Sequence, residues 1–116
     1  MSESRVANLA EEHCVPCHGG VTPLKGDELY RLAGQVPDWK VVEDHHLTRS
    51  FVFPDFRKAL DFVNRIGAVA EQEGHHPDIL LTWGKVDVTT YTHAINGLSE
   101  NDFILAAKID RQFPAG

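Results

Sequence analysis

The sequence predicts an α+β fold, an antiparallel four-stranded sheet with helices packed on one face. Apolar residues recur at helical spacing in segments 24–36, 55–73 and 99–113. Segments 39–53 and 78–93 instead alternate with period two around short turns, as hairpins do. The resulting order is helix, hairpin, helix, hairpin, helix. Because it contains no βαβ alternation and no Gly-x-Gly-x-x-Gly motif, a nucleotide-binding parallel sheet is disfavoured.

Length and composition indicate one ordinary globular domain. The chain has 116 residues, of which 42% are hydrophobic and 24% charged. No apolar run approaches the roughly 20 residues that a membrane span needs. A formal charge of −6 without a Lys/Arg cluster argues against a nucleic-acid partner. The first residues lack the basic start and apolar stretch of a signal peptide, so we expect a cytoplasmic protein.

The N-terminal segment carries a separate motif. We expect residues 1–21 to form a partly ordered arm and residues 22–116 to form the domain. Cys14-Val15-Pro16-Cys17-His18 matches the attachment pattern of a c-type haem, but that attachment normally follows export. Zinc would need a less crowded ligand set, and a redox Cys-x-x-Cys usually opens a helix after a strand. Incidental thiols are therefore the favoured interpretation.

The first helix and hairpin are predicted from their apolar residues. In segment 24–36 these fall at helical spacing: Leu29, Leu32, Ala33 and Val36. In the hairpin, one face carries Leu47, Arg49, Phe51 and Phe53. The pair His45-His46 lies near the polar turn, where an exposed histidine needs no functional explanation.

The clearest helix is the segment 55–73. Asp55 is its expected N-cap and Gly74 the glycine that closes it. The predicted inward stripe comprises Phe56, Ala59, Leu60, Val63, Ile66, Gly67 and Ala70.

The second hairpin turns at Gly84-Lys85 and should return to His93, with Val86 and Val88 on one face. The last helix begins with a capping-box pattern, Ser99-x-x-Asp102. Its expected inward set is Phe103, Ala106, Ala107 and Phe113.

Histidines and carboxylates gather around the second hairpin in this prediction. His75 and His76 follow the helix end, and Pro77 holds His76 in an extended conformation. His93 ends the returning strand, so it should come back near the start of the hairpin. Asp102 opens the next helix, and Glu71 lies one helical turn before His75.

Three kinds of chemistry fit these residues. Imidazoles with nearby carboxylates can exchange protons near neutral pH, which suits an elimination, a hydration or a tautomerisation. The same histidines and a carboxylate could instead bind zinc, although adjacent histidines on a strand diverge. Each residue also has a structural explanation, such as capping by Asp102. Acid–base catalysis is favoured over the metal site and the structural interpretation.

The combined pattern resembles the pterin-4a-carbinolamine dehydratase family. It comprises His75-His76-Pro77, Trp83-Gly84-Lys85-Val86, Thr92-His93, Gly97-Leu98-Ser99, Asp102, Ala106 and Ile109-Asp110, with Trp39 and the segment from Phe51 to Phe56 upstream. The resemblance covers roughly residues 22–113. The run Ile79-Leu80-Leu81 departs from it where many members carry an aromatic residue.

The resemblance implies dehydration of 4a-hydroxytetrahydropterin to quinonoid dihydropterin, which recycles the pterin cofactor of an aromatic amino acid hydroxylase. His75, His76 and His93 match the family's active-site histidines, and Glu71 and Asp102 match its acidic residues near the pterin. Pro77 and Thr92 belong to the same motifs and are expected substrate-binding residues. The family uses no metal and no further cofactor, and it forms dimers and tetramers. A catalytically silent assembly or binding module of the same fold is the alternative.

Overall fold

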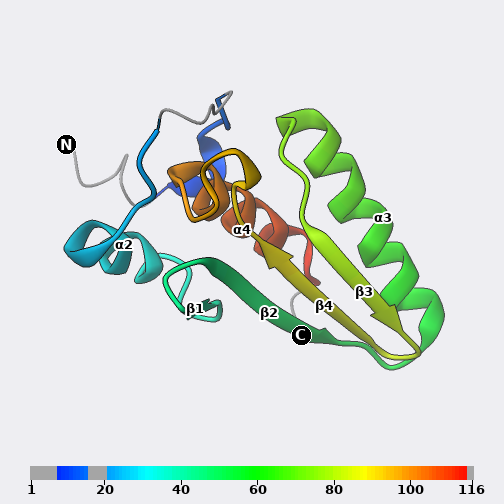
Figure 1. The fold of residues 1–116 in the computed structure, drawn as a ribbon. Helices are drawn as coiled ribbons and strands as arrows, with labels where there is room; N and C mark the ends of the chain where they lie inside the picture. Colours follow the sequence, from blue (N-terminus) through cyan, green and yellow to red (C-terminus); the bar gives the residue numbers. More distant parts are fainter. Residues whose placement is uncertain (1–7, 16–20, 115–116) are drawn as a thin grey trace.

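A computed structural model describes residues 8–15 and 21–114 of the chain (Figure 1). The helices are α2 (Gly26–Ala33), α3 (Phe56–Glu73) and α4 (Glu100–Gln112), with short 3-10 helices η1 (Leu9–Glu11) and η2 (His93–Ile95). The strands are β1 (Lys40–Val42), β2 (His46–Val52), β3 (Asp78–Thr82) and β4 (Lys85–Thr90). The predicted α+β fold and its order of helix, hairpin, helix, hairpin, helix are therefore confirmed. No helix in the described ranges is both long and apolar enough to cross a bilayer.

The four strands form one antiparallel sheet in the order β1-β2-β4-β3. β4 is central, and it pairs Val86 with Phe51 on β2 and with Leu81 on β3. Val86 and Val88 are fully buried, because α3 and α4 cover the face to which they point (Figure 1). β3 is left as an edge strand at the side of the sheet near α3.

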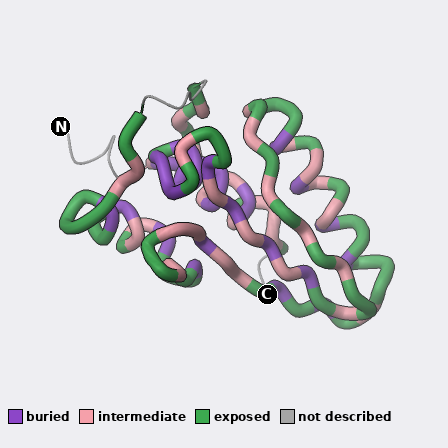
Figure 2. The backbone as a smooth tube through the Cα atoms, viewed as in Figure 1, coloured by how far each residue is buried: buried purple, intermediate pink, exposed green. Residues whose placement is uncertain are grey.

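Phe62 anchors α3 to the sheet, and the sequence prediction missed it. The buried positions of this helix are Ala59, Phe62, Ile66 and Ala70. By contrast, Phe56 and Leu60 are 43% and 37% exposed, so their place in the inward stripe was wrong. The helix carries apolar residues around more than one stripe. The large Phe62 ring decides which stripe faces inward, packing 4.7 Å from Phe51 between ring centroids. Figure 2 shows buried, intermediate and exposed positions alternating along this helix.

The last helix buries more of its surface than predicted. Phe103 and Ala106 are buried as expected, whereas Ala107 and Phe113 are half-buried. Ile104, Leu105 and Ile109 are also buried. The reason is that α4 contacts α3 on one side and η1 on another, so it has little free surface.

Asp55 caps α3 as predicted. Its carboxylate accepts a hydrogen bond of 2.8 Å from the backbone N–H of Lys58. At the other end, Gly74 adopts the left-handed conformation with φ of 66° and closes the helix. Both ends of the helix that leads into His75 are therefore fixed by local chemistry.

Replacing Asp55 with Ala should lower the free energy of unfolding by about 1 kcal/mol, because one N-terminal amide loses its acceptor. Urea denaturation measures the change. Asp55→Asn keeps a side-chain oxygen and serves as the control, with a loss of only a few tenths of a kcal/mol. An equal loss in both variants would contradict the capping role.

The described part of the N-terminal segment packs against α4. Leu9 is buried, Lys108 donates to the backbone oxygen of Ala10 at 2.8 Å, and Arg111 pairs with Glu11 at 3.8 Å. Of the predicted haem-like motif, Cys17 and His18 lie outside the described residues.

Candidate active site

Three chain segments meet beyond one end of the sheet. The first is the turn after α3, which carries His75, His76 and Pro77 into β3. The second follows β4, and the third is the start of α4. β4 ends at Thr90 rather than continuing to His93, which corrects the predicted strand.

The chain leaves the sheet early because Thr92 pairs with Gly97 across a tight loop, with a hydrogen bond of 2.8 Å between the Thr92 N–H and the Gly97 oxygen. His93 therefore lies in η2, within that loop. Gly97 also lies against Pro23. A Cβ at this position would come 2.8 Å from the proline Cβ, so a side chain does not fit there.

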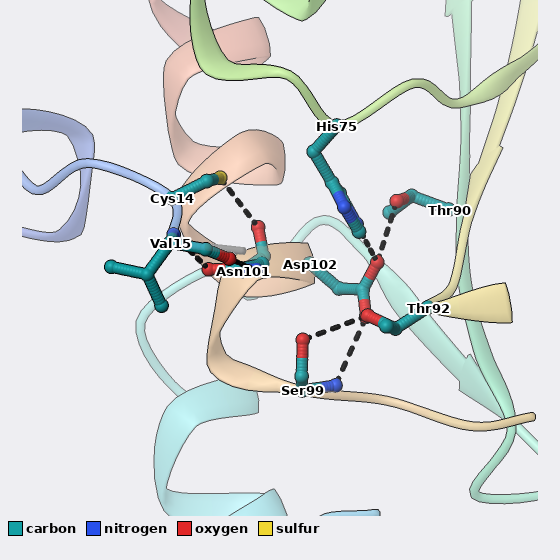
Figure 3. Close-up of polar contacts among 8 residues, drawn as sticks. All are labelled: Cys14, Val15, His75, Thr90, Thr92, Ser99, Asn101 and Asp102. Carbon is teal, nitrogen blue, oxygen red and sulfur yellow. Dashed lines mark hydrogen bonds and ion pairs between the residues drawn. The ribbon is translucent and has the colours of Figure 1, made fainter. Parts of the chain in front are cut away.

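Asp102 is the buried centre of the site, with 0% exposure (Figure 3). Its Oδ1 lies 2.7 Å from His75 Nε2 and accepts a hydrogen bond of 2.7 Å from the Thr90 hydroxyl. Its Oδ2 accepts from the Thr92 hydroxyl at 2.8 Å and from the Ser99 backbone N–H at 3.0 Å. These partners suit an ionised carboxylate, which only accepts hydrogen bonds.

This geometry fixes the tautomer of His75. Because the Asp102 oxygen accepts, His75 Nε2 carries the proton. His75 Nδ1 makes no hydrogen bond to any residue that the structure describes. That nitrogen is consequently left to exchange a proton with a ligand.

Asp102 thus does more than cap α4. Ser99 and Asp102 form the predicted capping box, but the cap accounts for only part of the carboxylate's contacts. Thr92, predicted as a substrate-binding residue, directs its hydroxyl to Asp102 and also receives a contact of 2.7 Å from the Ser99 hydroxyl. The Thr92 hydroxyl therefore supports the Asp102 carboxylate.

His76 bonds to Glu71 rather than to Asp102. Its Nε2 lies 2.6 Å from the Glu71 carboxylate, and both side chains are exposed. The prediction placed Glu71 one helical turn before His75, on the same helix face. In the structure Glu71 instead pairs with His76. An exposed pair of this kind holds orientation more than it contributes stability.

His93 is supported by a stack of rings that the sequence interpretation set aside. Its ring lies 4.2 Å from that of Tyr91, and Tyr91 lies 4.5 Å from His45. His45 is held in turn by the Asn96 side chain at 3.0 Å and by His46 at 3.1 Å. His45 therefore reaches the site through Tyr91, although it was predicted to have no role.

A pocket of about 570 Å³ joins these groups. It is lined by His75, His76, Pro77, Tyr91, Thr92 and His93, and also by Cys14, Val15, Glu73 and Asn101. This volume lies in the range of small-molecule binding sites, roughly 300–1,000 Å³. Glu71 is not part of the lining, but it contacts His76, which is. A second pocket of about 440 Å³, beside η1 and α2, contains none of the predicted site residues.

The residues that sequence reasoning missed come from two sources. Thr90 precedes the Thr92-His93 motif by two positions, so strand alternation could have placed its hydroxyl with that of Thr92. Cys14, Val15 and Asn101 belong to a contact between distant parts of the chain, which no local pattern reveals. Within the described ranges, no three or more His, Cys, Asp and Glu side chains converge so that they could hold a metal ion.

Comparison with known families identifies the architecture. Residues 22–112 match the model of the pterin 4 alpha carbinolamine dehydratase family. The chain belongs to this family. The matched range contains every predicted site residue, including the buried Asp102 and the pocket histidines.

Two relatives from bacteria agree with this assignment. A protein of Rubrobacter xylanophilus, provisionally named a pterin-4-alpha-carbinolamine dehydratase, is 60% identical over 106 residues, 91% of this chain and 99% of its own. A protein of Alkaliphilus metalliredigens with the same provisional name is 56% identical over 106 residues, 90% of this chain and 96% of its own.

Two solved structures share the fold. A transcriptional coactivator/pterin dehydratase from Brucella melitensis has a TM-score of 0.75 and 32% identity, with 80% of this chain and all of that chain covered. A pterin dehydratase-like protein described as a RuBisCO assembly factor has a TM-score of 0.59 and 22% identity, covering 68% of this chain and 93% of its own. The latter likeness concerns the fold alone.

Proposed function

We propose that the protein dehydrates 4a-hydroxytetrahydropterin to quinonoid dihydropterin. In this step the C4a–O bond breaks and the oxygen leaves as water after accepting a proton. The N5–H proton passes to a base, and the N5 electron pair forms the C4a=N5 bond. The balance needs one proton donor and one proton acceptor, which imidazoles supply near neutral pH.

The observation that carries the proposal is His75, whose Nε2–H is committed to Asp102 while Nδ1 is left for a ligand. Asp102 fixes the orientation of the ring and keeps Nδ1 as the nitrogen that can accept a proton. His76 and His93 line the same pocket, so the acid and base roles fall among these three residues. Pro77 contributes to substrate binding from the pocket wall.

Glu71 contributes through His76. Its carboxylate sets the orientation of that ring, because the 2.6 Å contact fixes which nitrogen faces away from α3. The product is the form of the pterin that a reductase returns to an aromatic amino acid hydroxylase, and the cytoplasm is the place for that cycle.

The test is loss of the 4a-hydroxypterin absorbance after turnover of phenylalanine hydroxylase. The purified chain should accelerate the loss above the buffer rate, equally with and without a chelator. A rate no better than buffer would sink the proposal.

A catalytically silent assembly module is the second candidate, since a protein of this fold is described as a RuBisCO assembly factor. The two candidate functions differ in whether they require the pocket histidines. A module of that kind would keep its partner binding after loss of His93, whereas an enzyme would lose its rate.

We further propose a homodimer or homotetramer. β3 is an edge strand, and it presents the exposed Leu80, with Trp83 69% exposed in the adjoining turn. Long unprotected edges with apolar side chains favour pairing with another chain. Light scattering after size exclusion should give two or four times 12.9 kDa, and Leu80→Lys should shift the mass toward the monomer.

A further inference from the structure

The segment Cys14–Val15 lines the pocket that holds the histidines, although it is far from them in sequence. We infer that this segment is a wall of the pterin site, held in place by Asn101 and Glu73 as positioning residues. The inference rests on the proposed function, because it assigns the pocket to the pterin. It extends the site beyond the residues 22–112 that define the family.

Asn101 clamps Val15 by its backbone (Figure 3). The Val15 N–H donates to Asn101 Oδ1 at 3.0 Å, and Asn101 Nδ2 donates to the Val15 oxygen at 2.6 Å. The amide thus makes the pair of hydrogen bonds that a neighbouring strand would make. Asn101 is itself buried and directly precedes Asp102 on α4. One turn of helix therefore fixes both His75 and the segment.

Glu73 makes the second clamp, from the end of α3. Its carboxylate accepts from the Cys14 N–H at 2.8 Å and lies 3.0 Å from His13 and 3.5 Å from Lys108. The side chain is 2% exposed. Burial alone would raise the pKa of Glu73, but the Cys14 N–H, His13 and Lys108 outweigh it and lower the pKa overall. The carboxylate consequently stays ionised and keeps its partners at working pH.

The clamped segment offers the pocket a neutral surface. The backbone groups of Cys14 and Val15 that bond to Glu73 and Asn101 are not available to a ligand. The Cys14 sulfur lies 3.5 Å from the Asn101 backbone oxygen. Burial, with the charges of Glu73 and Asp102, raises the pKa of Cys14 to about 12, so the thiol stays protonated at neutral pH.

A neutral wall beside the buried Asp102 suits the flat face of a bicyclic pterin. It covers the ring and excludes water from the proton-transfer groups without taking part in proton transfer. Loosening the wall should therefore weaken substrate binding more than it slows the chemical step. That separation distinguishes a binding wall from a general stabilising contact.

The kinetic test compares Asn101→Ala with the wild type. KM should rise about five- to tenfold while kcat changes less than about twofold, because only the clamp is lost. Asn101→Asp keeps the acceptor for the Val15 N–H but loses the donor to its oxygen, so its KM should lie between the two. Arg111→Ala is the matched control, since it removes another contact between the N-terminal segment and α4 but lies outside the pocket lining. An unchanged KM in Asn101→Ala would contradict the assignment of this segment to the pterin site. The same rise of KM in Arg111→Ala would also contradict it.

A labelling test is independent of turnover. In the Cys17→Ser variant, the remaining thiol is Cys14. Because this thiol stays protonated at neutral pH, iodoacetamide is applied in excess at alkaline pH, and mass spectrometry follows the slow rate of modification. Saturating 7,8-dihydropterin should slow the labelling severalfold, and Asn101→Ala should speed it without ligand. Fluorescence shows whether dihydropterin binds. If it binds but the rate of Cys14 labelling stays unchanged, the segment is not a wall of the pterin site.

The two tests separate the inference from the proposed function. If dihydropterin protects Cys14 but the protein does not dehydrate the substrate, the inferred wall is supported and the proposed activity is refuted. If the protein dehydrates the substrate, but Asn101→Ala leaves KM unchanged and dihydropterin does not protect Cys14, the proposed activity is supported and the inferred wall is refuted.

Discussion

Replacing Asp102 with Asn should lower kcat for dehydration by about 10²- to 10³-fold. The amide offers one oxygen and one NH₂ group where four donors now meet a carboxylate. An NH₂ group facing His75 Nε2 would require the other tautomer, with the proton on Nδ1. The nitrogen that should take a proton from the pterin would then already carry one. Stopped-flow measurement of the 4a-hydroxypterin absorbance gives the rate.

The same substitution should cost about 1–3 kcal/mol of unfolding free energy, because buried donors lose their acceptor. A control variant must separate the effect of this lost stability on kcat from a direct effect on catalysis. Thr90→Val removes another donor to Asp102 Oδ1 but leaves the contact with His75. It should therefore cost stability and change kcat only a few-fold. Equal losses of kcat in the two variants would show that Asp102 acts only through the fold.

The sequence sufficed for the fold because local patterns and covalent order determine most of it. Asp55 and Gly74 mark the ends of α3 by chemistry that needs no distant partner. The alternation of Val86 and Val88 sets the inner face of β4. The prediction failed on α3, where it placed Phe56 in the core and missed Phe62. Only packing against Phe51 decides between them.

The candidate site shows the same division. The proximity of His75 to Asp102 was predictable, since a hairpin returns the chain to its start. The partners of each histidine were not, because His76 could reach Glu71 only once the turn after α3 was placed. Contacts such as that of Val15 with Asn101 join residues 86 positions apart, and no periodicity encodes them.

His93→Ala should lower kcat by on the order of 10²-fold, if this ring supplies one of the two proton transfers. His93 is exposed on η2 and makes no buried contact that the fold requires. The free energy of unfolding should therefore stay within about 0.5 kcal/mol of the wild type. The absorbance assay and urea denaturation together separate the chemical effect from the structural one.

The ring stack supplies the matched controls for this prediction. Tyr91→Ala removes the ring between His93 and His45, so it should lower kcat less than loss of His93 itself, because the imidazole remains but is less well oriented. His46→Ala alters only the far end of the stack and should leave kcat close to the wild-type value. A graded loss in the order His93, Tyr91, His46 fits catalysis by a positioned imidazole. If His93→Ala retains the wild-type rate, proton transfer must rest on His75 and His76. If the wild type is itself inactive while the fold and pocket persist, the chain acts as the silent module instead.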